Sequence, residues 1–222
     1  MSELVVDELV VAGVLFDLDG TLVDSTGSVN RNWTLMCESM GWPVAEVIGR
    51  FHGMPASGAL RVIDPTLSDA RIAELNAVLI AGETADTDGV VPLPGVVDLL
   101  ASLPPDRWAI VTSCPPGLAA ARLGAAGLPM PERIITSADV ARGKPDPEPF
   151  RLGAGLLGLD PARCLAVEDA PAGIASALAA GCQVMAVRTS HPGLVVDGVR
   201  ATVPNLAGVR IGVEADGLHI SW

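Results

Sequence analysis

The run from residue 9 to residue 21 constrains the fold of this chain more than any other segment. Residues 9–16 are apolar or glycine, and the chain continues as Asp17-Leu18-Asp19-Gly20-Thr21. This pattern predicts a buried strand that ends in two carboxylates. Side chains at positions i and i+2 of a strand point to the same side, so Asp17 and Asp19 are expected to converge on one spot. Because Asp-Gly is also a common turn sequence, the segment alone leaves both a turn and a ligand site open.

Strand and helix patterns alternate from residue 92 onward. We expect helices at 94–103, 116–126, 147–158 and 171–180, and strands at 108–111, 134–135, 164–167, 183–187 and 201–203. The remainder of this region is expected to be loop-rich. Repeated β-α units predict an α/β fold with a doubly wound, mainly parallel sheet and helices on both of its faces. Ligands bind such a sheet at the carboxyl ends of its strands, where Asp17 is expected to lie.

No strand pattern occurs between residues 24 and 88. Apolar residues at helical spacing predict helices at 28–40, 55–63 and 68–82, and Ser68 is a suitable N-cap for the third. We therefore expect an all-helical domain inserted after the first strand. The predicted organisation is a core built from residues 1–22 and 92–222, with the helical insertion at 23–91.

Composition argues against several classes of partner. The formal net charge of −12 disfavours binding to nucleic acid or to an anionic membrane. The longest apolar stretch, 9–16, is much shorter than the roughly 20 residues of a membrane-spanning helix. The acidic segment 1–8 lacks the basic start of a secretory signal. The four cysteines form no C-x-x-C pair, so we expect reduced thiols in a cytoplasmic protein, and nothing in the sequence demands more than a monomer.

Two further segments offer groups that suit a phosphate. Thr112 and Ser113 follow the predicted strand at 108–111, where a hydroxyl and a free backbone N–H can hold a phosphate oxygen. The alternative is that these hydroxyls satisfy backbone groups of a turn. Lys144 lies between a glycine and a proline, on a constrained loop, and could neutralise a carboxylate beside a phosphate. A solvated surface lysine is the alternative interpretation.

A second pair of carboxylates follows the predicted strand at 164–167. Glu168 and Asp169 stand there, just before a helix that is expected to begin at Pro171. Together with Asp17 they predict a site for a hard cation, and oxygen ligands without histidine or cysteine favour Mg²⁺. The alternative is that Asp169 only caps the following helix.

These four segments, in this order and at this spacing, resemble motifs I to IV of the haloacid dehalogenase-like superfamily of hydrolases. The resemblance covers nearly the whole chain. The insertion at 23–91 resembles the helical cap of the sugar-phosphatase and phosphoglucomutase branch. The stretches 29–33, 52–53, 88–95 and 108–113 are similar to bacterial sugar (hexitol) phosphatases, which are related to fungal 2-deoxyglucose-6-phosphate and glycerol-3-phosphate phosphatases.

The resemblance implies a role for each acidic residue. Asp17 would be the nucleophile that forms an aspartyl phosphate, and Lys144 would help to keep it ionised. Asp19 would protonate the leaving oxygen and then activate water, while its backbone carbonyl would bind Mg²⁺. Asp169 would be a direct metal ligand, and Glu168 would bind the metal directly or through water.

The resemblance also implies how substrate is held. Thr112, Ser113 and backbone amides near Leu18 would bind phosphate oxygens. In the cap loop, His52 would either contact substrate hydroxyls or pack, and Arg50 is a further candidate contact.

Three functions follow from the resemblance. The first is a Mg²⁺-dependent phosphomonoesterase that hydrolyses small sugar or polyol phosphates. The second is a phosphoglucomutase-like enzyme, disfavoured because Met54, Pro55 and Ala56 stand where relatives tend to have the cation that grips a second phosphate. The third is a catalytically silent binding protein with the same fold, disfavoured because every catalytic position is filled by the expected residue.

Overall fold

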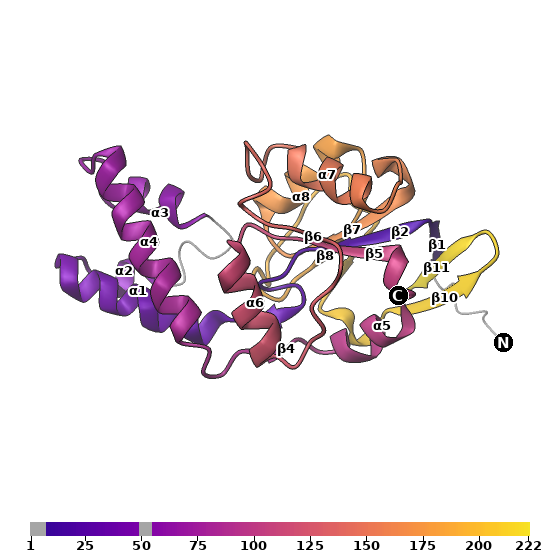
Figure 1. Cartoon of the computed structure of the whole chain (residues 1–222), viewed down its shortest axis with the longest axis horizontal. Helices are drawn as coiled ribbons and strands as arrows, with labels where there is room; N and C mark the ends of the chain where they lie inside the picture. The colour runs from indigo at the N-terminus through magenta and orange to yellow at the C-terminus, as the bar shows by residue number, and fades with distance from the viewer. Residues whose placement is uncertain (1–7, 49–54) are drawn as a thin grey trace.

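The computed structural model of the chain describes residues 8–48 and 55–222. Its centre is a six-stranded parallel sheet with the order β6-β5-β2-β7-β8-β9 (Figure 1). The strands are β2 (Gly13–Phe16), β5 (Trp108–Val111), β6 (Ile134–Ile135), β7 (Cys164–Glu168), β8 (Gln183–Val187) and β9 (Ala201–Val203). Numbered by chain order within this sheet, the strands run 3-2-1-4-5-6, the order of a doubly wound fold. The predicted fold class is confirmed.

Helices cover both faces of the central sheet. Val14 and Phe16 of β2 join the apolar cluster of one face, which includes residues of α5 (Val96–Ser102) and α6 (Pro116–Ala125). Leu15 points the other way, into the cluster formed with α7 (Glu148–Leu156) and α8 (Pro171–Ala180). Burial on both faces explains why β2 is apolar at every side-chain position rather than alternating.

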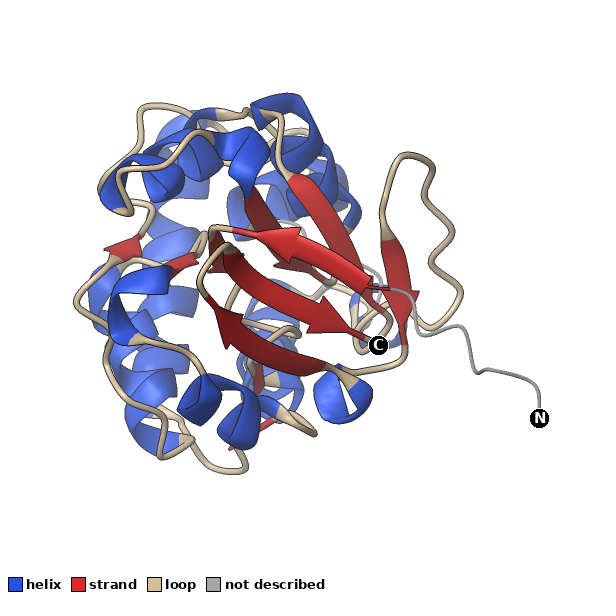
Figure 2. Ribbon diagram, turned by 90° about the vertical axis from the view of Figure 1, so that its right-hand side faces the viewer, coloured by secondary structure: helices blue, strands red, loops and turns tan. Residues whose placement is uncertain are grey.

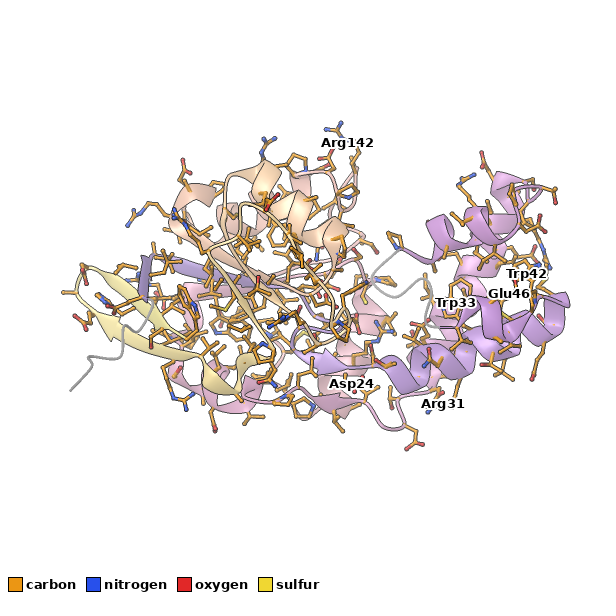
Figure 3. All side chains as sticks on the ribbon, turned by 180° about the vertical axis from the view of Figure 1, so that it is seen from behind. Asp24, Arg31, Trp33, Trp42, Glu46 and Arg142 are labelled. Carbon is orange, nitrogen blue, oxygen red and sulfur yellow. The ribbon has the colours of Figure 1, made fainter. Side chains whose placement is uncertain are left out.

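An inserted group of helices, the cap, lies beyond the carboxyl ends of the strands (Figure 1). It consists of α1 (Thr26–Met40), α2 (Val44–Val47), α3 (Ala56–Ile63) and α4 (Asp69–Ala85). The cap has an apolar cluster of its own, in which Trp33 is buried and against which Trp42 packs (Figure 3). The predicted N-cap is present, because the Ser68 hydroxyl accepts a hydrogen bond from the Arg71 N–H.

Two short strands join the cap to the core. β3 (Val23–Asp24) and β4 (Val91–Pro92) pair in antiparallel fashion where the chain enters and leaves the cap. Nearby, the Arg31 guanidinium donates to both carboxylate oxygens of Asp86 at 2.8 Å. These contacts tie the two connecting segments to each other.

Within residues 8–48 and 55–222, no helix is long and apolar enough to cross a membrane.

The two ends of the chain differ from the sequence prediction. The apolar run 9–16 is two strands rather than one, because β1 (Glu8–Val11) ends before Ala12 and pairs with β11 (Gly217–Ser221) instead of the central sheet. β11 also pairs with β10 (Arg210–Glu214), which follows a 3-10 turn at Leu206–Gly208. The result is a separate three-stranded antiparallel sheet, visible with the other strands in Figure 2. The expectation of loops after residue 203 was therefore wrong.

Candidate active site

The strand order places the candidate site at one position on the sheet edge. β2 lies between β5 and β7, and the chain proceeds from this point toward both outer edges of the sheet. A crevice is expected at the carboxyl ends of strands where the order reverses in this way. Asp17 follows β2, Thr112 follows β5, and Asp169 follows β7, so three predicted segments meet there.

Lys144 connects the carboxylates of two of these strands. Its ammonium donates to Oδ1 of Asp17 at 2.6 Å, to Oε1 of Glu168 at 2.6 Å and to the carbonyl of Val111 at 2.8 Å. Lys144 is buried, so the interpretation of a solvated surface lysine was wrong. Burial opposes its charge, but the carboxylates of Asp17 and Glu168 outweigh that effect and raise the pKa of Lys144.

Glu168 is held by the backbone as well as by Lys144. Its Oε2 accepts hydrogen bonds from the N–H groups of Asp169 at 3.1 Å and Ala170 at 3.2 Å. A side chain at Gly173 would collide with the Glu168 carboxylate, so only glycine leaves room for it. Both oxygens are thus engaged by protein groups, which favours a role in holding Lys144 over direct ligation of a metal.

Asp17, Glu168 and Asp169 form an acidic cluster in which one carboxylate oxygen of each residue lies within 4.8 Å of the other two. Burial raises the pKa of Asp17 to about 7, with Lys144 opposing the rise and Glu168 adding to it. Burial also raises the pKa of Asp169 well above its ordinary value, and the charges of Asp17 and Glu168 raise it further. One ammonium faces three buried carboxylates, so the cluster holds more negative charge than Lys144 can balance. A divalent cation on oxygen ligands fits this arrangement.

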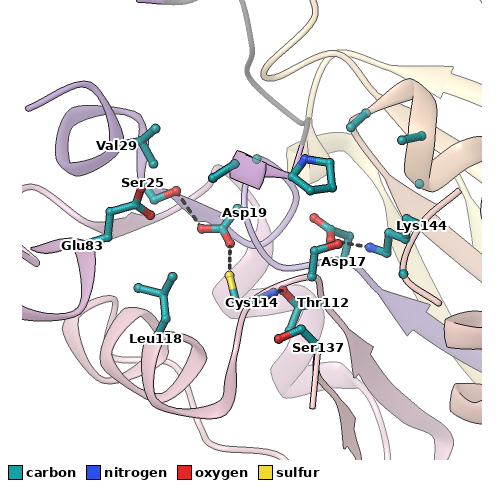
Figure 4. Close-up of a pocket in the computed structure, with 18 of the residues that line it drawn as sticks. Asp17, Asp19, Ser25, Val29, Glu83, Thr112, Cys114, Leu118, Ser137 and Lys144 are labelled. Carbon is teal, nitrogen blue, oxygen red and sulfur yellow. Dashed lines mark hydrogen bonds and ion pairs between the residues drawn. The ribbon is translucent and has the colours of Figure 1, made fainter. Parts of the chain in front are cut away.

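Asp19 does not join the acidic cluster. Its Oδ1 accepts a hydrogen bond from the Ser25 hydroxyl at 2.7 Å, and its Oδ2 lies 2.9 Å from the Cys114 thiol. Figure 4 shows the Asp19 carboxylate directed toward these two residues, while Asp17 faces Lys144. Asp17 and Asp19 line the same cavity, but their carboxylates bind different partners, because β2 ends at Phe16 and the spacing rule for strands does not apply beyond it.

Asp19 is bound by three residues to which the sequence interpretation gave no role: Ser25, Cys114 and Arg122. Arg122 of α6 donates to Oδ2 of Asp19 at 2.5 Å and to Oε2 of Glu83 at 2.5 Å. Burial and the nearby Asp19 raise the pKa of Cys114 well above its ordinary value, so Cys114 is a thiol that donates to Asp19. The signal for Arg122 was the single charge of the Ala-rich helix α6, and the signal for Glu83 was the single charge in residues 75–85, because such a charge is costly to bury without a partner.

Other predicted site residues take different positions. Thr112 and Ser113 line the cavity, and the Thr112 hydroxyl accepts a hydrogen bond from the Cys114 N–H at 3.1 Å. The Leu18 side chain is buried in the core, and its carbonyl accepts from the backbone of the turn that follows. His52 and Arg50 lie outside the residues that the structure describes, so their contacts stay predictions.

A cavity of about 550 Å³ lies between the cap and the core. The core supplies its charged floor, which includes Asp17, Lys144 and Asp169. The cap supplies a mixed wall of apolar and amide side chains from α1 and α4: Val29, Asn30, Trp33, Asn76, Leu79 and Ile80. The cavity thus joins an ionic end to a wall that suits an uncharged polar group.

The chain is similar to known proteins both in sequence and in fold. A family model for haloacid dehalogenase-like hydrolases matches residues 11–181. Hexitol phosphatase A of Escherichia coli (strain K12) is 48% identical over 207 residues, covering 92% of this chain and 96% of that protein. Glycerol-1-phosphate phosphohydrolase 1 of Saccharomyces cerevisiae is 32% identical over 219 residues, covering 92% and 86%. The crystal structure of a hydrolase from Pseudomonas syringae gives a TM-score of 0.76 at 25% identity, covering 88% of this chain and 94% of that chain.

The chain therefore belongs to the haloacid dehalogenase-like hydrolases. The family resemblance of its four motifs is confirmed, and so is the architecture of a Rossmann-like core with an inserted helical cap.

Proposed function

We propose that this protein is a Mg²⁺-dependent phosphatase that hydrolyses small sugar or polyol phosphates. The buried contact between Lys144 and Asp17, beside an acidic cluster and below an open cavity, carries the proposal. The names of the relatives, a hexitol phosphatase and a glycerol-1-phosphate phosphohydrolase, support the substrate class. The cap wall supports it too, because it carries the amide groups of Asn30 and Asn76, which can bind hydroxyls.

Asp17 is the proposed nucleophile. Lys144 holds one of its oxygens and so orients the carboxylate within the cavity. Attack by Asp17 on phosphorus forms an aspartyl phosphate and breaks the bond between phosphorus and the substrate oxygen. Water then attacks the same phosphorus, which releases inorganic phosphate and restores the Asp17 carboxylate.

Asp19 is the proposed general acid and base. Protonated Asp19 gives its proton to the departing substrate oxygen, and the resulting carboxylate later removes a proton from the attacking water. In the structure Asp19 is bound by Ser25, Cys114 and Arg122, so its carboxylate must turn toward Asp17 to act. Thr112, Ser113 and the amide of Leu18 are proposed to hold the phosphate oxygens.

Asp17 and Asp169 are the proposed carboxylate ligands of Mg²⁺, with the backbone carbonyl of Asp19 as a further ligand. Glu168, whose oxygens are engaged by Lys144 and the backbone, is proposed to act through water. The bound cation would offset the repulsion between the carboxylates and an anionic phosphate.

We also propose the organisation that carries this activity. Residues 1–22 and 92–222 form the core domain, and residues 23–91 form the cap domain. The four cysteines are free thiols, which fits the reducing conditions of the cytoplasm, where we place the enzyme. One chain supplies every proposed catalytic residue, so a monomer is sufficient.

Phosphate release from a panel of hexose, hexitol, pentose and glycerol phosphates tests the proposal. We expect release that requires Mg²⁺, and we expect it to disappear in Asp17→Asn, which cannot form the intermediate. Turnover by Asp17→Asn at the wild-type rate would refute the covalent route. No release from any compound would instead favour the mutase, whose assay is bisphosphate-dependent isomerisation of a sugar 1-phosphate.

A further inference from the structure

A single buried guanidinium joins the cap to the proposed acid–base residue. Arg122 lies on the core helix α6 and is only 4% exposed. Its Nη1 lies 2.5 Å from Oδ2 of Asp19, and its Nη2 lies 2.5 Å from Oε2 of Glu83. Asp19 belongs to the core, whereas Glu83 lies on the cap helix α4. Arg122 therefore contacts both the core and the cap, at the interface that would open if the cap moved away.

The partners of Arg122 keep Asp19 in one orientation. Oδ2 of Asp19 receives hydrogen bonds from Arg122 and from the Cys114 thiol, while Oδ1 receives one from Ser25. Arg122 also lies 3.0 Å from the sulfur of Cys114. Together these three residues hold the Asp19 carboxylate, and Figure 4 shows it directed toward Ser25 and Cys114 and away from Asp17. Arg122 is the only one of the three that also contacts the cap carboxylate of Glu83.

The contact between Arg122 and Glu83 depends on how the cap sits on the core. Glu83 is buried where α4 packs against α6. The Nε of Arg122 has no hydrogen-bond partner among residues 8–48 and 55–222, so the guanidinium is fixed through its two Nη groups. Separation of α4 from α6 would remove Glu83 and leave Asp19 as the sole carboxylate bound to Arg122. Removing one partner from a buried ion pair is costly, so this contact resists separation.

We propose that Arg122 is a positioning residue for Asp19, and that Glu83 makes its hold on Asp19 depend on contact between cap and core. With the cap docked, Glu83 binds Nη2 and shares the charge of the guanidinium, which weakens the hold of Nη1 on Asp19 and leaves its carboxylate freer to turn toward the leaving group. With the cap apart, Arg122 binds Asp19 alone and keeps it withdrawn. This inference rests on the proposed phosphatase function of Asp19.

Two substrates with different leaving groups separate this role from a structural one. The leaving group of a polyol phosphate is an alkoxide, which needs a proton from Asp19. The leaving group of 4-nitrophenyl phosphate is the stable 4-nitrophenolate anion, which does not. The value of kcat/KM reports steps up to transfer of the phosphoryl group to Asp17, where this difference applies. General acids contribute roughly 10²- to 10⁴-fold, so a change in how far Asp19 is withdrawn should be easily measured.

In Arg122→Gln, Asp19 is no longer held away from the leaving group, so we expect kcat/KM for the polyol phosphate to rise by up to about tenfold relative to that for 4-nitrophenyl phosphate. Glu83→Gln, which leaves Asp19 as the sole carboxylate bound to Arg122, should shift this ratio in the opposite direction. The ratio for Arg122→Lys should lie between those of wild type and Arg122→Gln. In an Asp19→Asn background, Arg122→Gln should no longer change the ratio. Arg151→Gln, a substitution on the exposed side of α7, serves as the control and should leave the ratio unchanged. An unchanged ratio in both variants, or a shift in the same direction for Arg122→Gln and Glu83→Gln, would overturn the proposal.

A second measurement does not depend on turnover. Hydrogen exchange in α4 and α6 should accelerate in Arg122→Gln and in Glu83→Gln, and the double variant should exchange no faster than Arg122→Gln. Additive acceleration would contradict a shared contact and overturn the link between cap and Asp19. If wild-type protein releases phosphate from neither substrate, the proposed function fails, while the exchange experiment still decides whether Arg122 and Glu83 act together.

Discussion

The ammonium of Lys144 lies 2.6 Å from Oδ1 of Asp17, although 127 residues separate the two in the chain. A second bond of 2.6 Å to Glu168 fixes the same ammonium between two strands of the sheet. Lys144 is thus the one cation within the acidic cluster of Asp17, Glu168 and Asp169 among the described residues. Its loss would leave three buried carboxylates facing one another.

Lys144→Met should therefore impair both folding and activity. We expect a loss of about 3–5 kcal/mol in the free energy of unfolding without metal, as for other buried ion pairs that lose one partner. We expect phosphate release to fall by at least about 100-fold, because a charge that stabilises the transferring phosphoryl group is lost. Urea unfolding and initial rates measure the two effects.

Arg142→Met is the matched control for Lys144→Met, because Arg142 lies nearby in the same loop but is exposed (Figure 3). It should leave activity unchanged and alter stability by less than about 1 kcal/mol. A Lys144→Met variant with wild-type rates would rule out a role for this lysine in the reaction.

Asp169→Asn should stabilise the metal-free protein at alkaline pH. Because burial and neighbouring carboxylates raise the folded-state pKa of Asp169, its contribution to stability is present below the ordinary pKa of 3.8 and is lost as pH rises through the raised value. Asparagine removes the charge that causes this loss. We expect a higher melting temperature than wild type at pH 8 in EDTA, and a difference that shrinks toward pH 4.

Magnesium should reverse the order of the two melting temperatures, so that the wild type becomes more stable than Asp169→Asn. Added Mg²⁺ should raise the melting temperature of the wild type at pH 8 and have little effect on Asp169→Asn, which lacks the ligand charge. A wild-type melting temperature that ignores Mg²⁺ would be evidence against a metal site at this cluster.

His219 should make the terminal sheet sensitive to alkaline pH. Its ring nitrogens lie 2.9 Å from Asp216 and 2.9 Å from Glu8, and these contacts raise the pKa of His219 to about 9, with the Asp216 contact contributing most. The stabilisation is complete below the ordinary value of 6.5 and is lost as pH rises through about 9. The melting temperature of wild type should therefore exceed that of His219→Gln at pH 6, and the difference should vanish by about pH 10.

Asp216→Asn provides the matched control for His219, since it removes the main partner and keeps the histidine. In the Asp216→Asn background, the stabilisation that His219 provides should be lost at a lower pH than in the wild-type background. A difference that stays constant from pH 6 to pH 10 would show that His219 contributes by packing rather than by charge.

The central sheet and its helices could be predicted from the sequence because each element buries a continuous apolar surface. The segments at the ends of the chain could not. Residues 9–16 look like one strand, yet Val11 pairs with Leu218 and Gly13 pairs with Cys164, in two different sheets. An apolar run does not reveal which partner each residue meets. Alternating residues in 210–214 and the Asp216-Gly217 dipeptide, which spans the end of the turn and the start of β11, were signals of the hairpin that the prediction missed.

The site shows the same limit at the level of side chains. The motifs follow predicted parallel strands, and the carboxyl ends of such strands lie side by side. The sequence therefore predicts that Asp17, Lys144 and Asp169 lie close together. It does not give the direction of Asp19, whose carboxylate depends on contacts from Arg122 and Cys114. Such contacts join helices far apart in sequence, and local patterns carry no information about them.

Direct detection of a phosphoryl group on Asp17 tests the central claim. Asp19→Asn should accumulate this intermediate with 4-nitrophenyl phosphate, because the leaving group needs no proton but hydrolysis lacks its base. After acid quenching, we predict that mass spectrometry of peptides finds one phosphoryl group on Asp17, and that hydroxylamine removes it. Turnover with Asp17 unmodified at every quench time, or a phosphoryl group on another residue, would contradict the proposed mechanism.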